Sequence, residues 1–193
     1  MKELKHYCPK CGKELIDKSS HVKKFFLLIC EDCTYCISNP NIIDISFKSK
    51  GLAKALSNLC PYPFEFDDVK CSSMEAFIQS LKVKYPDVQE EICSKTGPFC
   101  YNLREMFDDW RETGNVYWKG KEICRQSKKY IMLLTRAYEA LWNQSLIFRY
   151  ALIKVKENGY ILDHSIGCDD PSETLLTPKE YMGLLDHLMK DCL

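Results

Sequence analysis

Hydrophobic residues recur at helical spacing over a stretch near the middle of the chain. Met74, Phe77, Ile78 and Leu81 follow one another at steps of three, one and three residues, and this pattern places them on one face of a helix. Residues 72–82 are therefore predicted to contain a short amphipathic helix.

Helical periodicity also dominates the rest of the pattern. It predicts further helices over residues 85–93, 99–110, 121–142, 144–154 and 178–190. Short apolar runs predict strands over residues 24–29, 42–47 and 160–164. The expected fold class is mainly α, with a few short strands.

For two of these helices the sequence pattern predicts further details. The 121–142 helix is expected to bury Ile123, Tyr130, Ile131, Leu134, Ala137, Tyr138 and Leu141. At the start of the last helix, Thr177, Pro178 and Glu180 match an N-cap, a proline at the first helical position and a capping-box glutamate.

A polar stripe runs beside the apolar face of the 72–82 helix. Glu75, Gln79 and Lys82 are spaced at i, i+4 and i+7, so a carboxylate, an amide and an amine share one side of the helix. An alternative is that Ser72 and Glu75 form a capping box, in which the carboxylate only satisfies backbone N–H groups. The spacing leaves both interpretations open.

Four cysteines near the N-terminus have the spacing of a metal site. Cys8 and Cys11 form one C-x2-C pair and Cys30 and Cys33 form another, an arrangement that brings four thiolates around Zn2+. Cys36 is an alternative to Cys33 as the fourth ligand. We therefore expect a small β zinc ribbon with a structural Zn2+ over residues 1–40, followed by a helical domain over residues 41–193.

The ribbon has a second possible role, which is to grip nucleic acid. Lysines for phosphate contacts are present at Lys10, Lys13, Lys18, Lys23 and Lys24. However, 27 basic and 27 acidic residues give a formal net charge of zero, so the whole chain carries no field that favours nucleic acid. A structural role is therefore preferred over a nucleic-acid adaptor.

Composition and the apolar segments indicate the cellular location of the protein. The 193 residues include 12 cysteines, but the N-terminus lacks the apolar segment of a signal peptide. The apolar runs are also too short to span a bilayer. We expect a cytoplasmic protein with no membrane partner, whose oligomeric state the sequence leaves open.

The order of several motifs over residues 51–189 resembles the NADAR superfamily, which is linked to NAD and ADP-ribose metabolism. The motifs are Leu56-Ser57-Asn58, Pro61, Pro63-Phe64, Ser73-Met74-Glu75, Gln79-Ser80-Leu81-Lys82, Tyr117-Trp118-Lys119-Gly120, Arg125, Tyr130, His164-Ser165-Ile166-Gly167, Asp170-Pro171, Thr174-Leu175-Leu176-Thr177 and Glu180.

This resemblance implies a compact helical domain and an enzyme, an N-glycosidase that hydrolyses the ribose C1–N bond. The implied substrate is an ADP-ribosylated base or a related ribosylated nucleotide, with an ADP-ribose-type nucleotide or ADP-ribosylated nucleic acid as the partner and no cofactor for catalysis. Two alternatives stay open: an N-glycosidase of a riboflavin-pathway ribosylaminopyrimidine phosphate, and a non-catalytic module that binds ADP-ribose or an NAD-derived ligand.

The resemblance also implies roles for individual residues. Glu75 is the expected catalytic carboxylate and Lys82 the second catalytic group, which contacts phosphate or ribose or forms a Schiff base. The expected substrate-binding residues are Ser57, Asn58, Gln79, Trp118, Arg125, His164 and Gly167.

Three of these residues have simpler explanations. Trp118 is a candidate for the hydrophobic core, since most tryptophans are largely buried. Arg125 is expected to pair with an acid or a carbonyl, and His164 to make a structural hydrogen bond.

Overall fold

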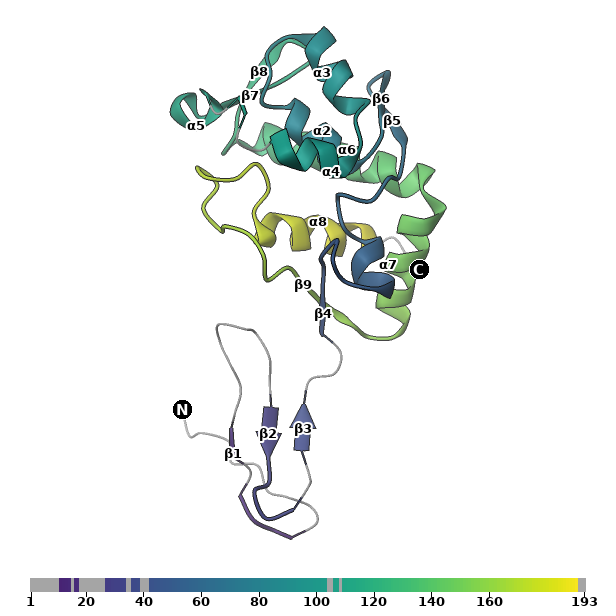
Figure 1. Cartoon of the computed structure of the whole chain (residues 1–193), viewed down its shortest axis with the longest axis vertical. Coiled ribbons are helices and arrows are strands. Elements are labelled where there is room, and N and C mark those ends of the chain that lie inside the picture. Colours follow the sequence, from purple (N-terminus) through teal and green to yellow (C-terminus); the bar gives the residue numbers. More distant parts are fainter. Residues whose placement is uncertain are drawn as a thin grey trace. The chain divides into compact units, whose positions relative to one another are not determined.

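In a computed structural model of the chain, the residues described are 11–14, 16–17, 27–33, 36–38, 42–103, 106–107 and 109–190. Backbone contacts divide the chain into two compact units, an N-terminal unit of residues 1–42 and a main unit of residues 43–193. Figure 1 shows the elements of both units along the sequence.

The N-terminal unit contains a small antiparallel sheet with the strand order β1-β2-β3. The strands are β1 Ile16–Asp17, β2 Leu27–Ile29 and β3 Cys36–Ser38. Ile29 pairs with Ile16 on one side and with Cys36 on the other. The predicted 24–29 strand is thus present over its last three residues, and its first three lie outside the described residues.

Helices dominate the rest of the chain, which confirms the expected fold class. They are α1 Gly51–Ala55, α2 Met74–Ser80, α3 Pro86–Cys93, α4 Gly97–Asn102, α5 Asp109–Thr113, α6 Lys128–Gln144, α7 Leu146–Glu157 and α8 Pro178–Lys190. The strands pair two by two: β4 Ile42–Asp44 with β9 Ile161–Asp163, β5 Phe64–Phe66 with β6 Val69–Cys71, and β7 Asn115–Trp118 with β8 Lys121–Cys124.

Helix α6 is at the centre of the core. It contacts α2, α7, α8, β5 and β8. Five of its residues that the sequence predicted to face inward are buried: Tyr130, Leu134, Ala137, Tyr138 and Leu141. Ile131 was also expected inside, but its side chain is exposed, because it lies on the solvent side of the helix.

The predicted 121–142 helix was wrong over its first residues, because residues 121–124 form strand β8. Trp118 pairs with Lys121, so Lys119 and Gly120 alone make the turn of a hairpin. Both have positive φ angles, 50° and 73°, as a two-residue type I′ turn requires. The helix begins only after this hairpin, at Lys128.

The predicted 99–110 helix was also wrong, since two short helices, α4 and α5, occupy this part of the chain. Phe107 lies between them with a φ of 59°, a left-handed conformation that interrupts a helix. Phe99, Met106 and Phe107 are exposed, so the expected apolar face does not form.

None of the helices in the described ranges is long and apolar enough to cross a lipid bilayer.

A buried arginine fixes the start of α8. Arg125 is 1% exposed, and its two terminal nitrogens donate to the two carboxylate oxygens of Glu180 at 2.9 and 2.7 Å. Its Nε donates to the carbonyl of Thr174 at 3.0 Å, and its guanidinium lies 4.5 Å from the centre of the Tyr130 ring. Arg125 therefore ties the hairpin end and α6 to the segment that leads into α8.

The predicted capping box at the start of α8 is confirmed. The Thr177 N–H donates to Glu180 Oε2 at 2.9 Å, and the Glu180 N–H donates to Thr177 Oγ1 at 3.1 Å. Burial alone would raise the pKa of Glu180, but hydrogen bonds from Arg125 and Thr177 outweigh it and lower this pKa below its ordinary value. Glu180 is thus held ionised beside Arg125.

Replacing Glu180 with glutamine is expected to lower the free energy of unfolding by about 3 kcal/mol at neutral pH, because it leaves the Arg125 charge buried without its counter-ion. Urea unfolding measures this loss. The loss should shrink in acid, since a carboxyl group whose pKa is lowered by folding stabilises the fold only while it is ionised.

Glu157→Gln is the matched control. Its exposed carboxylate pairs with Lys154 at 2.6 Å, and the change should cost at most about 0.5 kcal/mol. Equal losses in the two variants would contradict the structural role of the Arg125–Glu180 pair.

Candidate functional site

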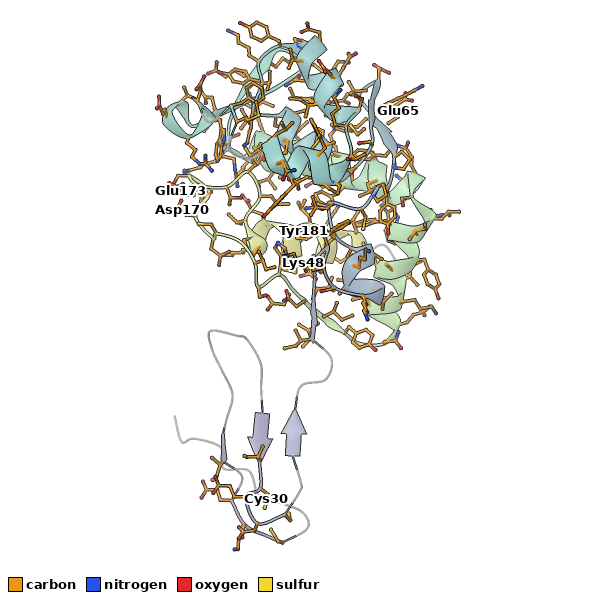
Figure 2. The ribbon with its side chains drawn as sticks, viewed as in Figure 1. Cys30, Lys48, Glu65, Asp170, Glu173 and Tyr181 are labelled. Atoms are coloured by element: carbon orange, nitrogen blue, oxygen red, sulfur yellow. The ribbon has the colours of Figure 1, made fainter. Side chains whose placement is uncertain are left out.

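A cleft of about 860 Å3 opens in the main unit. Helices α2, α4 and α5, the loops that follow β4 and β9, and residues 173–176 contribute to its lining, together with Tyr181 of α8. Lys48, Glu173 and Tyr181, labelled in Figure 2, come from three of these segments. This volume lies in the range of small-molecule sites.

Helix α2 supplies the polar residues of the cleft, and Ser73 sets where it begins. Ser73 Oγ accepts from the Ala76 N–H at 3.1 Å, whereas the Ser72 hydroxyl donates to the carbonyl of Lys95. The Glu75 N–H donates to the carbonyl of Asn58 at 2.9 Å. The capping-box interpretation of Ser72 and Glu75 is therefore wrong, since the cap lies one residue later and Glu75 lines the cleft.

The predicted stripe of Glu75, Gln79 and Lys82 is brought together in the cleft wall. Gln79 Nε2 donates to Glu75 Oε1 at 2.9 Å, and Lys82 Nζ lies 3.4 Å from the carbonyl of Met106. Burial raises the pKa of the Glu75 carboxyl, although the Gln79 hydrogen bond and the Lys82 charge act in the opposite direction. A carboxyl group with a raised pKa in a cleft is a candidate acid–base group.

Ser57 and Asn58 follow directly after α1 and line the cleft. Asn58 Oδ1 accepts from the Tyr138 hydroxyl at 2.8 Å, and Ser57 Oγ accepts from the Leu59 N–H at 3.4 Å. Burial raises the pKa of Tyr138, so its hydroxyl remains a hydrogen-bond donor. The Asn58 amide is therefore held in one orientation at the cleft.

His164 lines the cleft and also makes the structural hydrogen bond of the simpler explanation. Its Nδ1 lies 2.7 Å from the carbonyl of Ile45. A carbonyl only accepts, so Nδ1 is the donor in this hydrogen bond. The ring stands edge-on to Tyr181, with their centres 5.7 Å apart.

Gly167 lines the same side of the cleft as His164. Its φ of 142° is one that residues with side chains rarely adopt, and an added Cβ would lie 3.0 Å from Pro178 Cγ. A glycine is therefore needed for the loop to pass this close to α8.

Two residues expected to bind substrate lie elsewhere. Trp118 is buried against Phe66 and Phe77, with ring centres 5.7 and 5.0 Å apart, and its Nε1 donates to Asp67 Oδ2 at 2.9 Å. Arg125 forms an ion pair with Glu180. Neither lines the cleft, so the simpler explanations, core and ion pair, hold for both.

Sequence reasoning missed several residues of the cleft. These are Lys48, Tyr101, Trp110, Arg111 and Glu173. Arg111 Nη2 donates to the Glu173 carbonyl at 3.2 Å, and its Nε lies 3.5 Å from the Glu173 carboxylate. These contacts join residues 62 positions apart, and no local pattern in the sequence signals them.

Two buried polar atoms at the cleft have no hydrogen-bond partner. They are Gln79 Oε1 and Trp110 Nε1, and the side chains that the structure describes contain no other such atom. Each is expected to cost about 1–3 kcal/mol of stability. Both residues line the same cleft, so the protein carries this cost where a ligand would bind.

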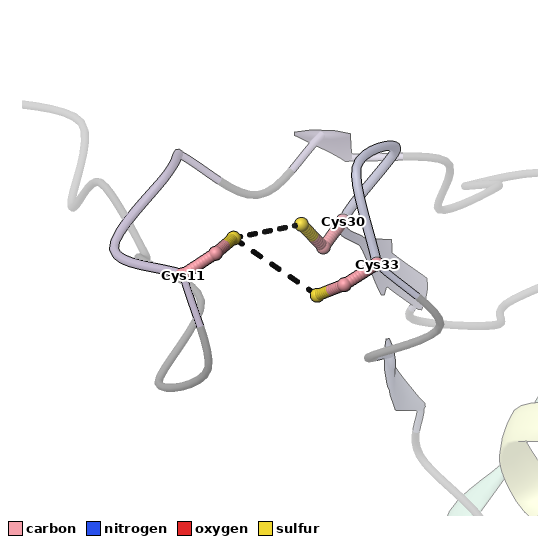
Figure 3. A group of neighbouring side chains, drawn as sticks. All are labelled: Cys11, Cys30 and Cys33. Atoms are coloured by element: carbon pink, nitrogen blue, oxygen red, sulfur yellow. Dashed lines mark hydrogen bonds between the residues drawn. The ribbon is translucent and has the colours of Figure 1, made fainter.

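The N-terminal unit brings three of the predicted metal ligands together (Figure 3). Cys11 Sγ lies 3.4 Å from Cys30 Sγ and 3.9 Å from Cys33 Sγ. Tetrahedral zinc with Zn–S bonds of about 2.3 Å separates its sulfur ligands by about 3.8 Å, so the three thiols fit this ion. Cys8 and the side chain of Cys36 lie outside the described residues.

Four of the five lysines proposed for nucleic acid lie outside the described residues: Lys10, Lys18, Lys23 and Lys24. Lys13 is described, and its Nζ donates to Asp32 Oδ1 at 2.6 Å. It is thus already paired with a carboxylate.

Comparison with known proteins gives a family. The family described as "Bacteriophage protein GP30.3" matches residues 50–190. An "Uncharacterized 17.1 kDa protein in Gp30-rIII intergenic region" of Enterobacteria phage T4 is 31% identical over 140 residues, which are 72% of this chain and 90% of the T4 protein. No solved structure matches the chain.

This match corrects the resemblance to the NADAR superfamily, because it covers almost the same stretch, residues 50–190, and assigns it differently. The N-glycosidase activity that the resemblance implied is overturned with it, and its two alternatives had the same basis. The chain belongs to the bacteriophage GP30.3 family.

Proposed function

We propose that the main unit is an enzyme that binds a polar small molecule in its cleft, with Glu75 as the general acid–base group. The observation that carries this proposal is a carboxyl group whose pKa is raised by burial, located in a cleft of ligand size. A catalytic acid–base group works best when its pKa lies near the working pH.

The neighbours of Glu75 fit such a role. Gln79 holds one carboxylate oxygen through its hydrogen bond, which fixes the direction of the other. The Lys82 charge acts on Glu75, so it would also stabilise negative charge that develops on a substrate after proton removal. Proton transfer to or from a bound molecule is the chemistry that these three residues support.

The test is consumption of a compound from a polar metabolite extract of bacterial cells, followed by mass spectrometry. Wild-type protein is expected to deplete at least one compound, and Glu75→Gln to deplete it about 100-fold or more slowly, because general acid–base catalysis contributes a factor of that order.

Glu65→Gln is the matched control, since this exposed carboxylate on β5 is no part of the cleft lining (Figure 2). It should act at the wild-type rate. Depletion by Glu75→Gln at the wild-type rate, or no depletion by any of the three proteins, would refute the proposal.

The raised pKa of Glu75 predicts a pH dependence of stability. Above the ordinary value of 4.5, the folded protein retains a proton that the unfolded chain releases, so Glu75 destabilises the fold increasingly as the pH rises through its folded pKa. Glu75→Gln removes this effect. The variant should therefore gain stability over the wild type between pH 4.5 and neutral pH, measured by urea unfolding.

Glu180 titrates in both proteins, so its contribution cancels in the difference. A variant that instead loses stability relative to the wild type as the pH rises would show that the Glu75 pKa is lowered, not raised.

We also propose that the N-terminal unit holds a structural Zn2+ through Cys11, Cys30 and Cys33, with Cys8 as the fourth ligand and Cys36 as the alternative. The three converging thiols carry this proposal. No disulfide forms among the cysteines that the structure describes, and this supports a reducing location, the cytoplasm.

Metal analysis of the purified full chain tests the site. We expect about one Zn2+ per chain in the wild type and in Cys124→Ser, an exposed cysteine of the main unit that serves as the control. Cys30→Ser should lose the ion, and comparing Cys8→Ser with Cys36→Ser identifies the fourth ligand. A wild-type protein purified without zinc would refute the proposal.

A further inference from the structure

The two unpartnered atoms of the cleft have different hydrogen-bonding needs. Gln79 Oε1 is an acceptor without a donor, and Trp110 Nε1 is a donor without an acceptor. Gln79 is 8% exposed and Trp110 is 2% exposed. Both side chains are therefore largely buried.

The orientation of the Gln79 amide follows from its neighbour. In the structure its nitrogen faces Glu75 and donates to Glu75 Oε1 at 2.9 Å. Oε1 is thus left as the open position, next to the Glu75 carboxylate.

Buried residues of the same types elsewhere in the main unit are fully used. Gln89 Nε2 donates to the carbonyls of Val83 and Tyr117 at 2.7 Å each, and Gln89 Oε1 accepts from the Lys119 N–H at 2.8 Å. Trp118 Nε1 is bonded to Asp67. Buried residues with structural roles are satisfied in this protein, whereas the unsatisfied pair lies at the cleft.

We propose that Gln79 and Trp110 determine the specificity of the cleft, and that they select a molecule with a primary carboxamide group. The amide –NH2 offers two protons, one for Gln79 Oε1 and one for the neighbouring Glu75 carboxylate, whereas a hydroxyl group offers only one. The amide carbonyl accepts from Trp110 Nε1. This inference rests on the cleft being a binding site, as in the proposed function.

A site built to hydrogen-bond one group rejects molecules that lack it, because its buried polar atoms then stay unpaired. Trp110 also lines a smaller hollow of about 300 Å3 beside the cleft.

The test is a titration of the full, 15N-labelled chain with acetamide, followed by NMR of the indole and side-chain amide signals. The Trp110 indole N–H and the Gln79 amide are expected to shift and saturate. The Trp118 indole and the Gln89 amide are internal controls that should not move. N,N-dimethylacetamide, which has no N–H, should bind about tenfold more weakly or not at all.

Two variants separate specificity from structure. Gln79→Met should lose the Trp110 indole response to acetamide and lower the melting temperature less than Gln89→Met does, because Gln79 makes one side-chain hydrogen bond and leaves its other polar atom unsatisfied. Gln89→Met, the matched change at a satisfied glutamine, should lower the melting temperature by several degrees and keep the response.

Equal binding of the two probes, an unchanged response in Gln79→Met, or no response at saturating acetamide would each overturn the inference. Its failure is distinguishable from that of the proposed function. If acetamide binds but no metabolite is turned over, the carboxamide site stands and the enzymatic activity is refuted. If a compound without an amide is turned over, the enzymatic activity stands and the carboxamide specificity is refuted.

Discussion

The burial of helix α2 is the constraint on which the main unit depends. This helix packs against α3, α4, α6 and β6, so most of its surface is buried. Its polar stripe must then be satisfied by its own members, by nearby backbone and by whatever enters the cleft. Gln79 satisfies Glu75 in part, and burial outweighs that help, which is why the pKa of Glu75 is raised. The geometry of the core thus produces the chemistry of the site.

A second set of buried polar groups in the same unit behaves differently. Arg125 uses its guanidinium on Glu180 and on the Thr174 carbonyl, and the result is a lowered pKa for Glu180. In such a closed set, all the polar groups are hydrogen-bonded to one another or to nearby backbone. Here the set fixes the start of α8 and the preceding residues that line the cleft. The α2 stripe is open, with an acceptor left over. Closed sets of this kind stabilise a fold, whereas open ones indicate where another molecule completes the bonding.

Local patterns in the sequence were sufficient for α2, for the α8 capping box and for the fold class. Periodicity alone placed Glu75, Gln79 and Lys82 on one side of a helix, and seven of the nine residues expected to act on a substrate line one cleft. The cap was ambiguous because Ser72 and Ser73 are adjacent hydroxyls, and only the contact with Lys95 separates them. Trp118 and Arg125 were indistinguishable from site residues, since their partners Asp67 and Glu180 lie 51 and 55 positions away.

The family match shows which of these residues lie in the part of the chain that defines the family. It begins at residue 50, so the paired cysteines lie outside the part of the chain that defines the family. Glu75, Gln79 and Trp110 lie inside it, as does the Arg125–Glu180 pair that fixes one wall. Only the loop after β4, with Lys48, reaches the cleft from outside the match. The proposed acid–base group and the two unpartnered atoms therefore belong to the part of the chain that defines the family, whereas the paired cysteines do not.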